Sequence, residues 1–186
     1  MKPLLALATA TALTLGAFSP ASHAELKVGA HAPEFSLPAW LAGNPFTFDL
    51  DAALKKGPVV VYFFPAPHTS GCNVEAHLFS EAIDKFKAYN ATVIGVTAGN
   101  LDQISDFSKE TDHCSGKFAV AADKGAAIAR EYDSILTMKP DWSNRTSYLI
   151  NQSGNIAAAY SAMSPKDHVG EMLAALKALP QAKPAH

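Results

Sequence analysis

The stretch that decides the fold is Val59-Val-Val-Tyr-Phe-Phe-Pro-Ala-Pro-His-Thr-Ser-Gly-Cys72. Its first six residues form a continuous apolar run with the length of a strand that is buried on both faces. Apolar residues then recur near one helical face across 73–86, so the segment predicts a strand, a turn and a helix. Cys72 would lie in the first turn of that helix, where unpaired N–H groups and the positive end of the helix dipole favour a thiolate. The stretch therefore predicts a reactive sulfur at the end of a buried strand.

The segments around this unit predict an alternation of strands and helices. Further strands are expected at 34–37, 47–50, 92–97 and 117–122, a hairpin at 145–150 and 156–160, and helical segments at 51–56, 101–110, 125–132 and 168–179. Strand, helix, strand and helix followed by a hairpin and a helix predict an α/β fold with a central mixed sheet flanked by helices on both faces. This is the thioredoxin-like order of elements. In that order Cys72 falls at the carboxyl edge of the sheet.

The first 24 residues are predicted to be a signal peptide rather than part of the fold. A short positive start precedes an apolar run over 4–18, and Ser22-His-Ala24 places small residues at the two positions that a signal peptidase reads. Cleavage after Ala24 would leave residues 25–186 as one domain and make the protein exported, most simply to a periplasm. The alternative is a membrane anchor, but this Ala- and Thr-rich run is weaker than the roughly 20 strongly apolar residues that a span needs. We therefore expect no stable membrane insertion.

Charge and cysteine content limit the function classes. The formal net charge of −2 comes with no basic stripe, so nucleic acid is not an expected partner. The two cysteines, Cys72 and Cys114, most simply form one structural disulfide in an exported protein. Their contexts favour a redox-active pair instead, because Cys72 begins a helix and Cys114 lies in a polar stretch, 109–117, that is expected to be a solvated loop.

The pattern Pro65-x-x-x-Thr69-x-x-Cys72 resembles the signature of the peroxiredoxins. Phe63-Phe-Pro together with Thr69-Ser-Gly-Cys72 is most similar to the branch called PrxQ or bacterioferritin-comigratory protein. Residues 145–150 resemble the later strand that carries the family's active-site arginine. The resemblance extends from about Leu26 to Leu179, and it implies that Cys72 is the peroxidatic cysteine.

The resemblance also implies roles for the residues around Cys72. Pro65 would shield the pocket, and Thr69 would donate a hydrogen bond to the sulfur or the peroxide. Backbone N–H groups near Gly71 and Cys72 would hold the second peroxide oxygen as negative charge develops on it. The alternative for Thr69 is a helix cap, with Ser70 as a competing candidate.

Two charged residues complete the implied site. Arg145 would stabilise the thiolate by charge and hydrogen bonding, whereas the alternative is a surface ion pair with the nearby Asp141. Glu75 would orient the site, or it would only favour the helix N-terminus electrostatically.

Cys114 is the implied resolving cysteine. In part of the branch that cysteine lies five residues after the peroxidatic one, but His77 occupies this position here. Other members place it near the end of the next helix, where Cys114 falls, so the resemblance implies an intramolecular Cys72–Cys114 disulfide. Such a bond needs Cα atoms within about 7 Å. We therefore expect the first turn near Cys72 to unwind and the 109–117 loop to move.

The leading hypothesis is an exported thiol peroxidase that reduces hydrogen peroxide and organic hydroperoxides and is recycled by a thioredoxin-like or other dithiol donor. It would need no cofactor and would be a monomer or weak dimer. One alternative, a thiol–disulfide oxidoreductase, lacks its Cys-x-x-Cys motif because Thr69 occupies the first position. The other is a non-catalytic binding domain with a structural disulfide. Although His68, His77 and His113 lie near the cysteines in sequence, their spacing is not that of a zinc site, and no metal is expected.

Overall fold

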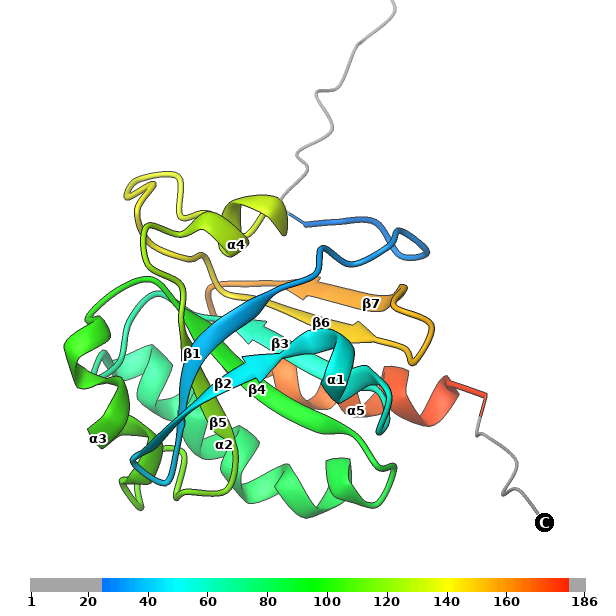
Figure 1. Ribbon diagram of the computed structural model, residues 1–186, viewed down its shortest axis with the longest axis horizontal. Coiled ribbons are helices and arrows are strands. Elements are labelled where there is room, and N and C mark those ends of the chain that lie inside the picture. Colours follow the sequence, from blue (N-terminus) through cyan, green and yellow to red (C-terminus); the bar gives the residue numbers. More distant parts are fainter. Residues whose placement is uncertain (1–24, 181–186) are drawn as a thin grey trace, which may run out of the picture.

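The computed structural model describes residues 25–180, and within that range a seven-stranded sheet forms the centre of the molecule (Figure 1). Its strands are β1 (Ser36–Leu41), β2 (Asn44–Asp49), β3 (Val59–Phe63), β4 (Thr92–Thr97), β5 (Ala119–Ala122), β6 (Thr146–Ile150) and β7 (Ile156–Ser161). The helices are α1 (Leu50–Leu54), α2 (Ser70–Lys87), α3 (Ile104–Lys109), which a 3₁₀ turn at Leu101–Gln103 precedes, α4 (Ala127–Glu131) and α5 (His168–Ala178).

The sheet is mixed, as the order of elements predicts. Its strand order is β2-β1-β5-β4-β3-β6-β7. Strands β3, β4 and β5 run parallel, while β6 pairs with β3 in the antiparallel sense and β1 pairs with β5 in the same way. Every residue of β3 is buried, because the strand has a neighbour on each side and helices over both faces. This confirms the thioredoxin-like α/β arrangement.

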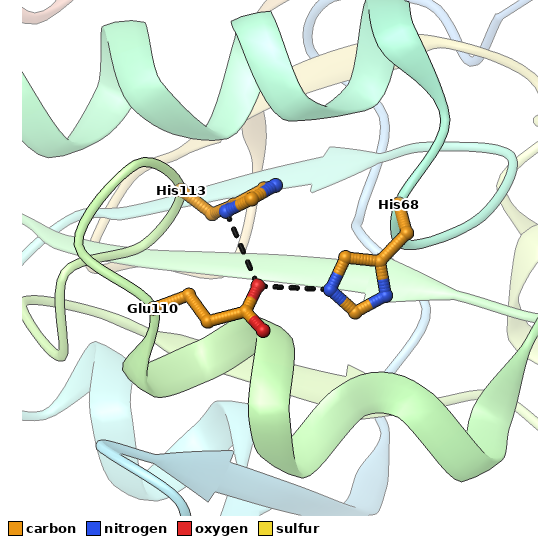
Figure 2. Close-up of side chains that lie close together, drawn as sticks. All are labelled: His68, Glu110 and His113. Carbon is orange, nitrogen blue, oxygen red and sulfur yellow. Dashed lines mark hydrogen bonds and ion pairs between the residues drawn. The ribbon is translucent and has the colours of Figure 1, made fainter.

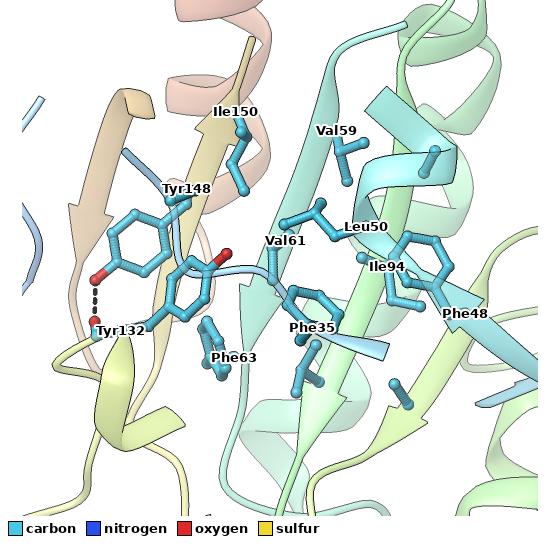
Figure 3. Packing of buried hydrophobic residues seen from close by; sticks show 14 of the residues in the cluster. Phe35, Phe48, Leu50, Val59, Val61, Phe63, Ile94, Tyr132, Tyr148 and Ile150 are labelled. Atoms are coloured by element: carbon cyan, nitrogen blue, oxygen red, sulfur yellow. Dashed lines mark hydrogen bonds between the residues drawn. The ribbon is translucent and has the colours of Figure 1, made fainter. Parts of the chain in front are cut away.

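Alternation along β3 builds two hydrophobic cores. Val59, Val61 and Phe63 point to the face that α1 and α4 cover, where they join aromatic residues such as Tyr132 and Tyr148 (Figure 3). Residues 60, 62 and 64 point to the opposite face, toward α2, α3 and α5. The sheet therefore has a packed helix layer on each side, and Cys72 belongs to the second.

The second core is rich in stacked aromatic rings. Tyr62 stacks on Phe79 of α2 with ring centroids 4.4 Å apart and on Phe64 at 5.4 Å. Rings of this size bury large apolar areas and hold offset-stacked geometries. Because Phe79 lies two turns after Cys72 on α2, this stack fixes the start of the helix against the sheet.

Several predicted boundaries differ from the structure. The extended segment expected at 34–37 is β1 at Ser36–Leu41, because its pairing with β2 extends it past Pro38 to Trp40 and Leu41. Helix α2 begins at Ser70, two residues before Cys72. The helix expected at 101–110 is divided into a 3₁₀ turn and α3.

The predicted signal peptide, with cleavage after Ala24, lies outside the described residues. Between residues 25 and 180 there is no helix with both the length and the apolar character needed to span a membrane.

Candidate active site

Cys72 lies in the first turn of α2, at the end of the loop that leaves the central strand β3. Its side chain is 1% exposed. The N–H groups of Ser70, Gly71 and Cys72 precede the first intrahelical bond, which Asn73 N makes to Thr69 O. The sulfur is therefore held close to free donors and to the positive end of an 18-residue helix.

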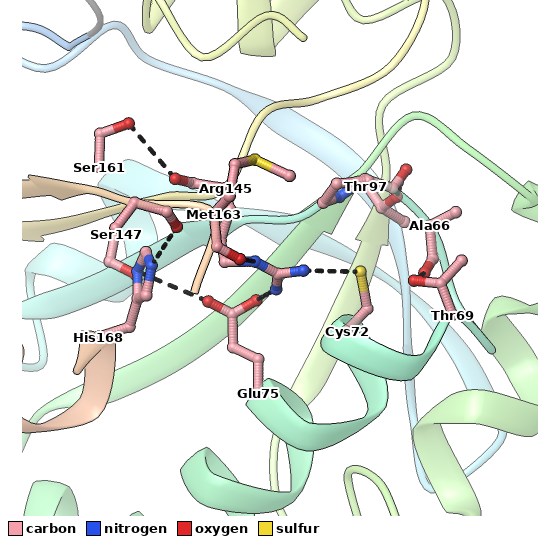
Figure 4. Close-up of polar contacts among 12 residues, drawn as sticks. Ala66, Thr69, Cys72, Glu75, Thr97, Arg145, Ser147, Ser161, Met163 and His168 are labelled. Atoms are coloured by element: carbon pink, nitrogen blue, oxygen red, sulfur yellow. Dashed lines mark hydrogen bonds and ion pairs between the residues drawn. The ribbon is translucent and has the colours of Figure 1, made fainter. Parts of the chain in front are cut away.

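Arg145 reaches Cys72 from the residue before β6 (Figure 4). Its Nη2 donates to Cys72 Sγ at 3.4 Å, and its Nε donates to the carbonyl of Met163 at 3.0 Å. Its Nη1 donates to a carboxylate oxygen of Glu75. Arg145 is 3% exposed and pairs with Glu75 rather than with Asp141, so the alternative of a surface ion pair is wrong.

Glu75 lies one helical turn after Cys72 and is fully buried, so it is not a solvated charge at the helix N-terminus. Burial raises the pKa of Glu75 to about 8, although the Arg145 guanidinium opposes that shift. Its second oxygen, Oε1, has no hydrogen-bond partner and lies 3.6 Å from His168 Nδ1. Glu75 therefore contacts Arg145 directly, and its role in orienting the guanidinium stays a prediction.

His168, the first residue of α5, lies beside Glu75. Its Nε2 lies 2.9 Å from the carbonyl of Ala162, and its Nδ1 lies 2.8 Å from Ser147 Oγ (Figure 4). Burial lowers the pKa of His168, which favours the neutral ring. A carbonyl can only accept, so Nε2–H donates to Ala162, and in the neutral ring Nδ1 accepts from the serine.

The loop between β3 and α2 is held by its neighbours. Pro65 is buried, and its carbonyl accepts a hydrogen bond from Thr97 Oγ1 at 3.0 Å. The loop also passes so close to Gly99 that a Cβ there would lie 2.5 Å from the Pro65 carbonyl oxygen. Pro65 thus lies just past the end of β3 in a tightly packed loop, and its role in shielding the pocket stays a prediction.

Thr69 occupies the N-cap position of α2, but its side chain does not cap the helix. Its Oγ1 donates to the carbonyl of Ala66 at 3.1 Å instead. A hydroxyl has one proton to donate, and among the described residues no hydrogen bond joins Thr69 to Cys72 Sγ. Donation from Thr69 to the sulfur or to a substrate stays a prediction.

Gly71 makes room for the guanidinium. A Cβ at this position would lie 3.0 Å from Arg145 Nη2, the atom that donates to Cys72. The lack of a side chain is therefore part of how Arg145 reaches the sulfur. Whether the N–H groups of Gly71 and Cys72 hold a substrate oxygen stays a prediction.

Cys114 does not lie in a solvated loop as the sequence predicted. It is 0% exposed, because the turn after α3 folds its side chain into the same core that contains Cys72, Tyr62 and Phe118. Burial raises the pKa of the Cys114 thiol well above its usual value. Both cysteines are free thiols in this structure, so the Cys72–Cys114 disulfide stays a prediction.

Sequence reasoning did not identify His168, Ser147 or the Met163 carbonyl as part of this site. Each lies on a segment far from Cys72 in the chain, and only the packing of α5 and β7 against α2 and β6 brings them near. The one local signal was His168 itself, a polar residue at the start of an amphipathic helix that the fold buries completely.

Comparison with known proteins gives consistent family matches. A profile described as the AhpC/TSA family matches residues 28–159. Peroxiredoxin Q, chloroplastic, of Oryza sativa subsp. japonica is 30% identical over 126 residues, covering 67% of this chain but only 57% of the rice protein. Peroxiredoxin Q, chloroplastic, of Sedum lineare is 27% identical over 84% of this chain and 81% of the relative.

A solved structure agrees with these matches. The crystal structure of peroxidoxin BcpB from Mycobacterium tuberculosis superposes with a TM-score of 0.71 at 25% identity. The match covers 83% of this chain and 99% of the mycobacterial chain.

Proposed function

The chain belongs to the AhpC/TSA family, and on that premise we propose that it is a thiol peroxidase that reduces hydrogen peroxide and organic hydroperoxides. The observation that carries the proposal is the contact of a buried Arg145 with Cys72 Sγ at the start of α2. The guanidinium is held in place by Glu75 and a backbone carbonyl. An ionised sulfur at this position would accept its hydrogen bond and would act as the nucleophile.

The first step is attack of the Cys72 thiolate on one peroxide oxygen. The S–O bond forms as the O–O bond breaks, and the departing oxygen leaves as water or an alcohol after taking up a proton. Cys72 is left as a sulfenic acid. In this proposal, Arg145 and the N–H groups near Gly71 and Cys72 would stabilise the negative charge that develops on the departing oxygen.

The second step is resolution by Cys114. Its thiol sulfur would attack the sulfenic sulfur, forming the Cys72–Cys114 disulfide and releasing water. Both side chains are buried in the resting structure, in the same core, and we expect the start of α2 to unwind and the segment 109–117 to move as the disulfide forms. Left-handed backbone at Ser115 and Gly116 marks the turn in that segment. A thioredoxin-like or other dithiol donor would then reduce the disulfide.

We also propose that the protein is exported, most simply to a periplasm, after cleavage at Ala24, and that it is a monomer or weak dimer. The support for export is the pattern of residues 1–24 in the sequence. The mass of the protein recovered from an expressing bacterium's periplasm tests it, since cleavage predicts a chain that begins at Glu25. Recovery of the uncleaved chain in the membrane fraction would contradict it.

Steady-state turnover tests the proposed activity. With a dithiol such as dithiothreitol, the wild-type protein should consume hydrogen peroxide and cumene hydroperoxide, whereas Cys72→Ser should consume neither above the background rate. Peptide mapping of protein oxidised by one equivalent of peroxide should find the Cys72–Cys114 disulfide within one chain. A disulfide that resists the dithiol, with no peroxide consumption, would favour a binding domain with a structural disulfide.

A further inference from the structure

Three side chains from two parts of the chain converge beside the active-site loop: His68, Glu110 and His113 (Figure 2). His68 lies in the loop between β3 and Cys72, Glu110 follows the last residue of α3, and His113 directly precedes Cys114. One ligand atom from each lies within 4.8 Å of the other two. Their spacing in the sequence does not indicate a metal site, but the fold gathers two imidazoles and a carboxylate.

The distances fit a small divalent cation. Glu110 Oε2 lies 2.9 Å from His68 Nε2 and 3.3 Å from His113 Nδ1. A tetrahedral Zn²⁺ with nitrogen and oxygen ligands at about 2.0–2.1 Å has ligand atoms roughly 3.3 Å apart. The separation of Glu110 and His113 already has this size, and that of Glu110 and His68 is shorter. The two histidine nitrogens lie within 4.8 Å of one another, so binding would need a modest rearrangement of the three side chains.

His113 gives an independent reason to expect a ligand. Both of its ring nitrogens are shielded from solvent, and neither has a hydrogen-bond partner among the described residues. Its Nδ1 lies near Glu110 without hydrogen-bond geometry, while the ring packs on Phe107 with centroids 4.8 Å apart. Leaving a buried polar group unpaired is unfavourable. A cation at Nδ1 would give that nitrogen a partner.

His68 is already oriented as a metal ligand. Its Nδ1 lies 2.9 Å from Gln103 Oε1, so Nδ1–H can donate to the amide oxygen. That donation leaves the Nε2 lone pair directed at Glu110, which is the arrangement that outer hydrogen bonds impose on metal-binding histidines. Without a metal, a proton on Nε2 has to occupy the same place between His68 and Glu110.

We propose that His68, Glu110 and His113 bind one Zn²⁺ ion, with water completing the coordination. Two imidazoles and one carboxylate are a common ligand set for this ion. The site would tie the loop that leads to Cys72 to the segment that carries Cys114. Binding itself does not depend on the proposed function, but a consequence rests on it: the bound ion should restrain segment 109–117 and slow formation of the Cys72–Cys114 disulfide.

Isothermal titration of ZnCl₂ into the Cys72→Ser/Cys114→Ser protein tests binding without thiol ligands. We expect one ion per chain, with the dissociation constant raised at least tenfold by Glu110→Gln and by His68→Ala in this background. His31→Ala is the matched control, because it removes an exposed imidazole that bonds only to Ala32 O. Absence of a one-to-one site, or affinity equal in all variants, would overturn the proposal.

Glu110→Gln also guards against a folding defect. Glu110→Gln keeps the size of a partly exposed side chain, so its thermal unfolding without zinc should lie close to that of the parent. Visible absorption of Co²⁺ in place of Zn²⁺ gives a second readout, since tetrahedral nitrogen and oxygen coordination produces bands that a loosely bound ion lacks. An aqueous-type Co²⁺ spectrum at saturation would count against the site.

The coupling to Cys114 is tested separately in the wild-type protein. Saturating zinc should slow disulfide formation after peroxide addition about tenfold or more, and it should not do so in Glu110→Gln. Equal slowing in both proteins would show that zinc acts on the thiols directly and would overturn the coupling. If neither protein reacts with peroxide, the proposed peroxidase fails while the titration still decides the metal site.

Discussion

Replacement of Arg145 by methionine should slow the reaction of Cys72 with peroxide by about 10- to 150-fold. The substitution removes the donor that lies 3.4 Å from Cys72 Sγ but retains much of the buried volume. A hydrogen bond from a charged group contributes about 1.5–3 kcal/mol. Each 1.4 kcal/mol in the activation barrier changes a rate about tenfold, which gives the range stated.

The same substitution leaves Glu75 buried without its partner. Removal of one member of a buried ion pair usually costs about 3–5 kcal/mol. Because burial already raises the pKa of Glu75 to about 8, the carboxyl group can take up a proton near neutral pH. We therefore expect a smaller loss of about 1–3 kcal/mol, which urea denaturation would measure.

Stopped-flow mixing of the reduced variant with hydrogen peroxide measures the rate. Arg130→Met is the matched control, because Arg130 is the only other arginine in the chain and is exposed. The double variant Glu75→Gln/Arg145→Met removes the stranded carboxyl, so slow reaction that persists there reflects the lost guanidinium and not a folding defect. A rate for Arg145→Met within threefold of wild type would show that the guanidinium does not speed the reaction of Cys72 with peroxide.

Three further predictions concern Glu75, Tyr62 and Gly71. The raised pKa of Glu75 gives the wild type stability that is fully present below about pH 4.5 and is lost as the pH rises to about 8, at up to about 1.4 kcal/mol per pH unit. In Glu75→Gln the free energy of unfolding should lose this pH dependence. Urea denaturation across that range tests this, and parallel profiles for the two proteins would contradict it. Tyr62→Phe should raise the free energy of unfolding by about 1 kcal/mol, since the Tyr62 hydroxyl is buried without a hydrogen-bond partner; a measured loss of stability would oppose this. Gly71→Ala should displace the Arg145 guanidinium by a few tenths of an ångström and slow peroxide reduction roughly severalfold; an unchanged stopped-flow rate would show that the guanidinium does not depend on the missing side chain.

The elements whose own residues have a clear apolar pattern could be predicted from the sequence. The apolar run of β3, the helix after Cys72 and the hairpin of β6 and β7 all have the expected type and nearly the expected bounds. β1 begins and ends later than the extended segment predicted at 34–37, because antiparallel pairing with β2 carries the strand through Pro38 to Leu41. Such pairing is a tertiary effect that a single segment does not encode.

The site residues that lie on one segment could be predicted from the sequence, but the contacts between distant segments could not. Pro65, Thr69, Gly71 and Cys72 lie on one turn, so their proximity follows from the sequence. Burial of Cys114 does not follow, because its neighbours in the chain are polar and the apolar residues that cover it come from other elements. The contact of Glu75 with His168 depends on α5 packing against α2, and its contact with Arg145 joins α2 to the residue before β6, so neither follows from one segment.

The most direct test of the central claim is a single-turnover reaction of the reduced Cys114→Ser variant with one equivalent of hydrogen peroxide. We expect one sulfenic acid per chain, trapped by dimedone and mapped to Cys72. It should form much faster than Cys114 is oxidised in the Cys72→Ser variant. Equal rates at the two cysteines, or no trapped adduct at Cys72, would contradict it.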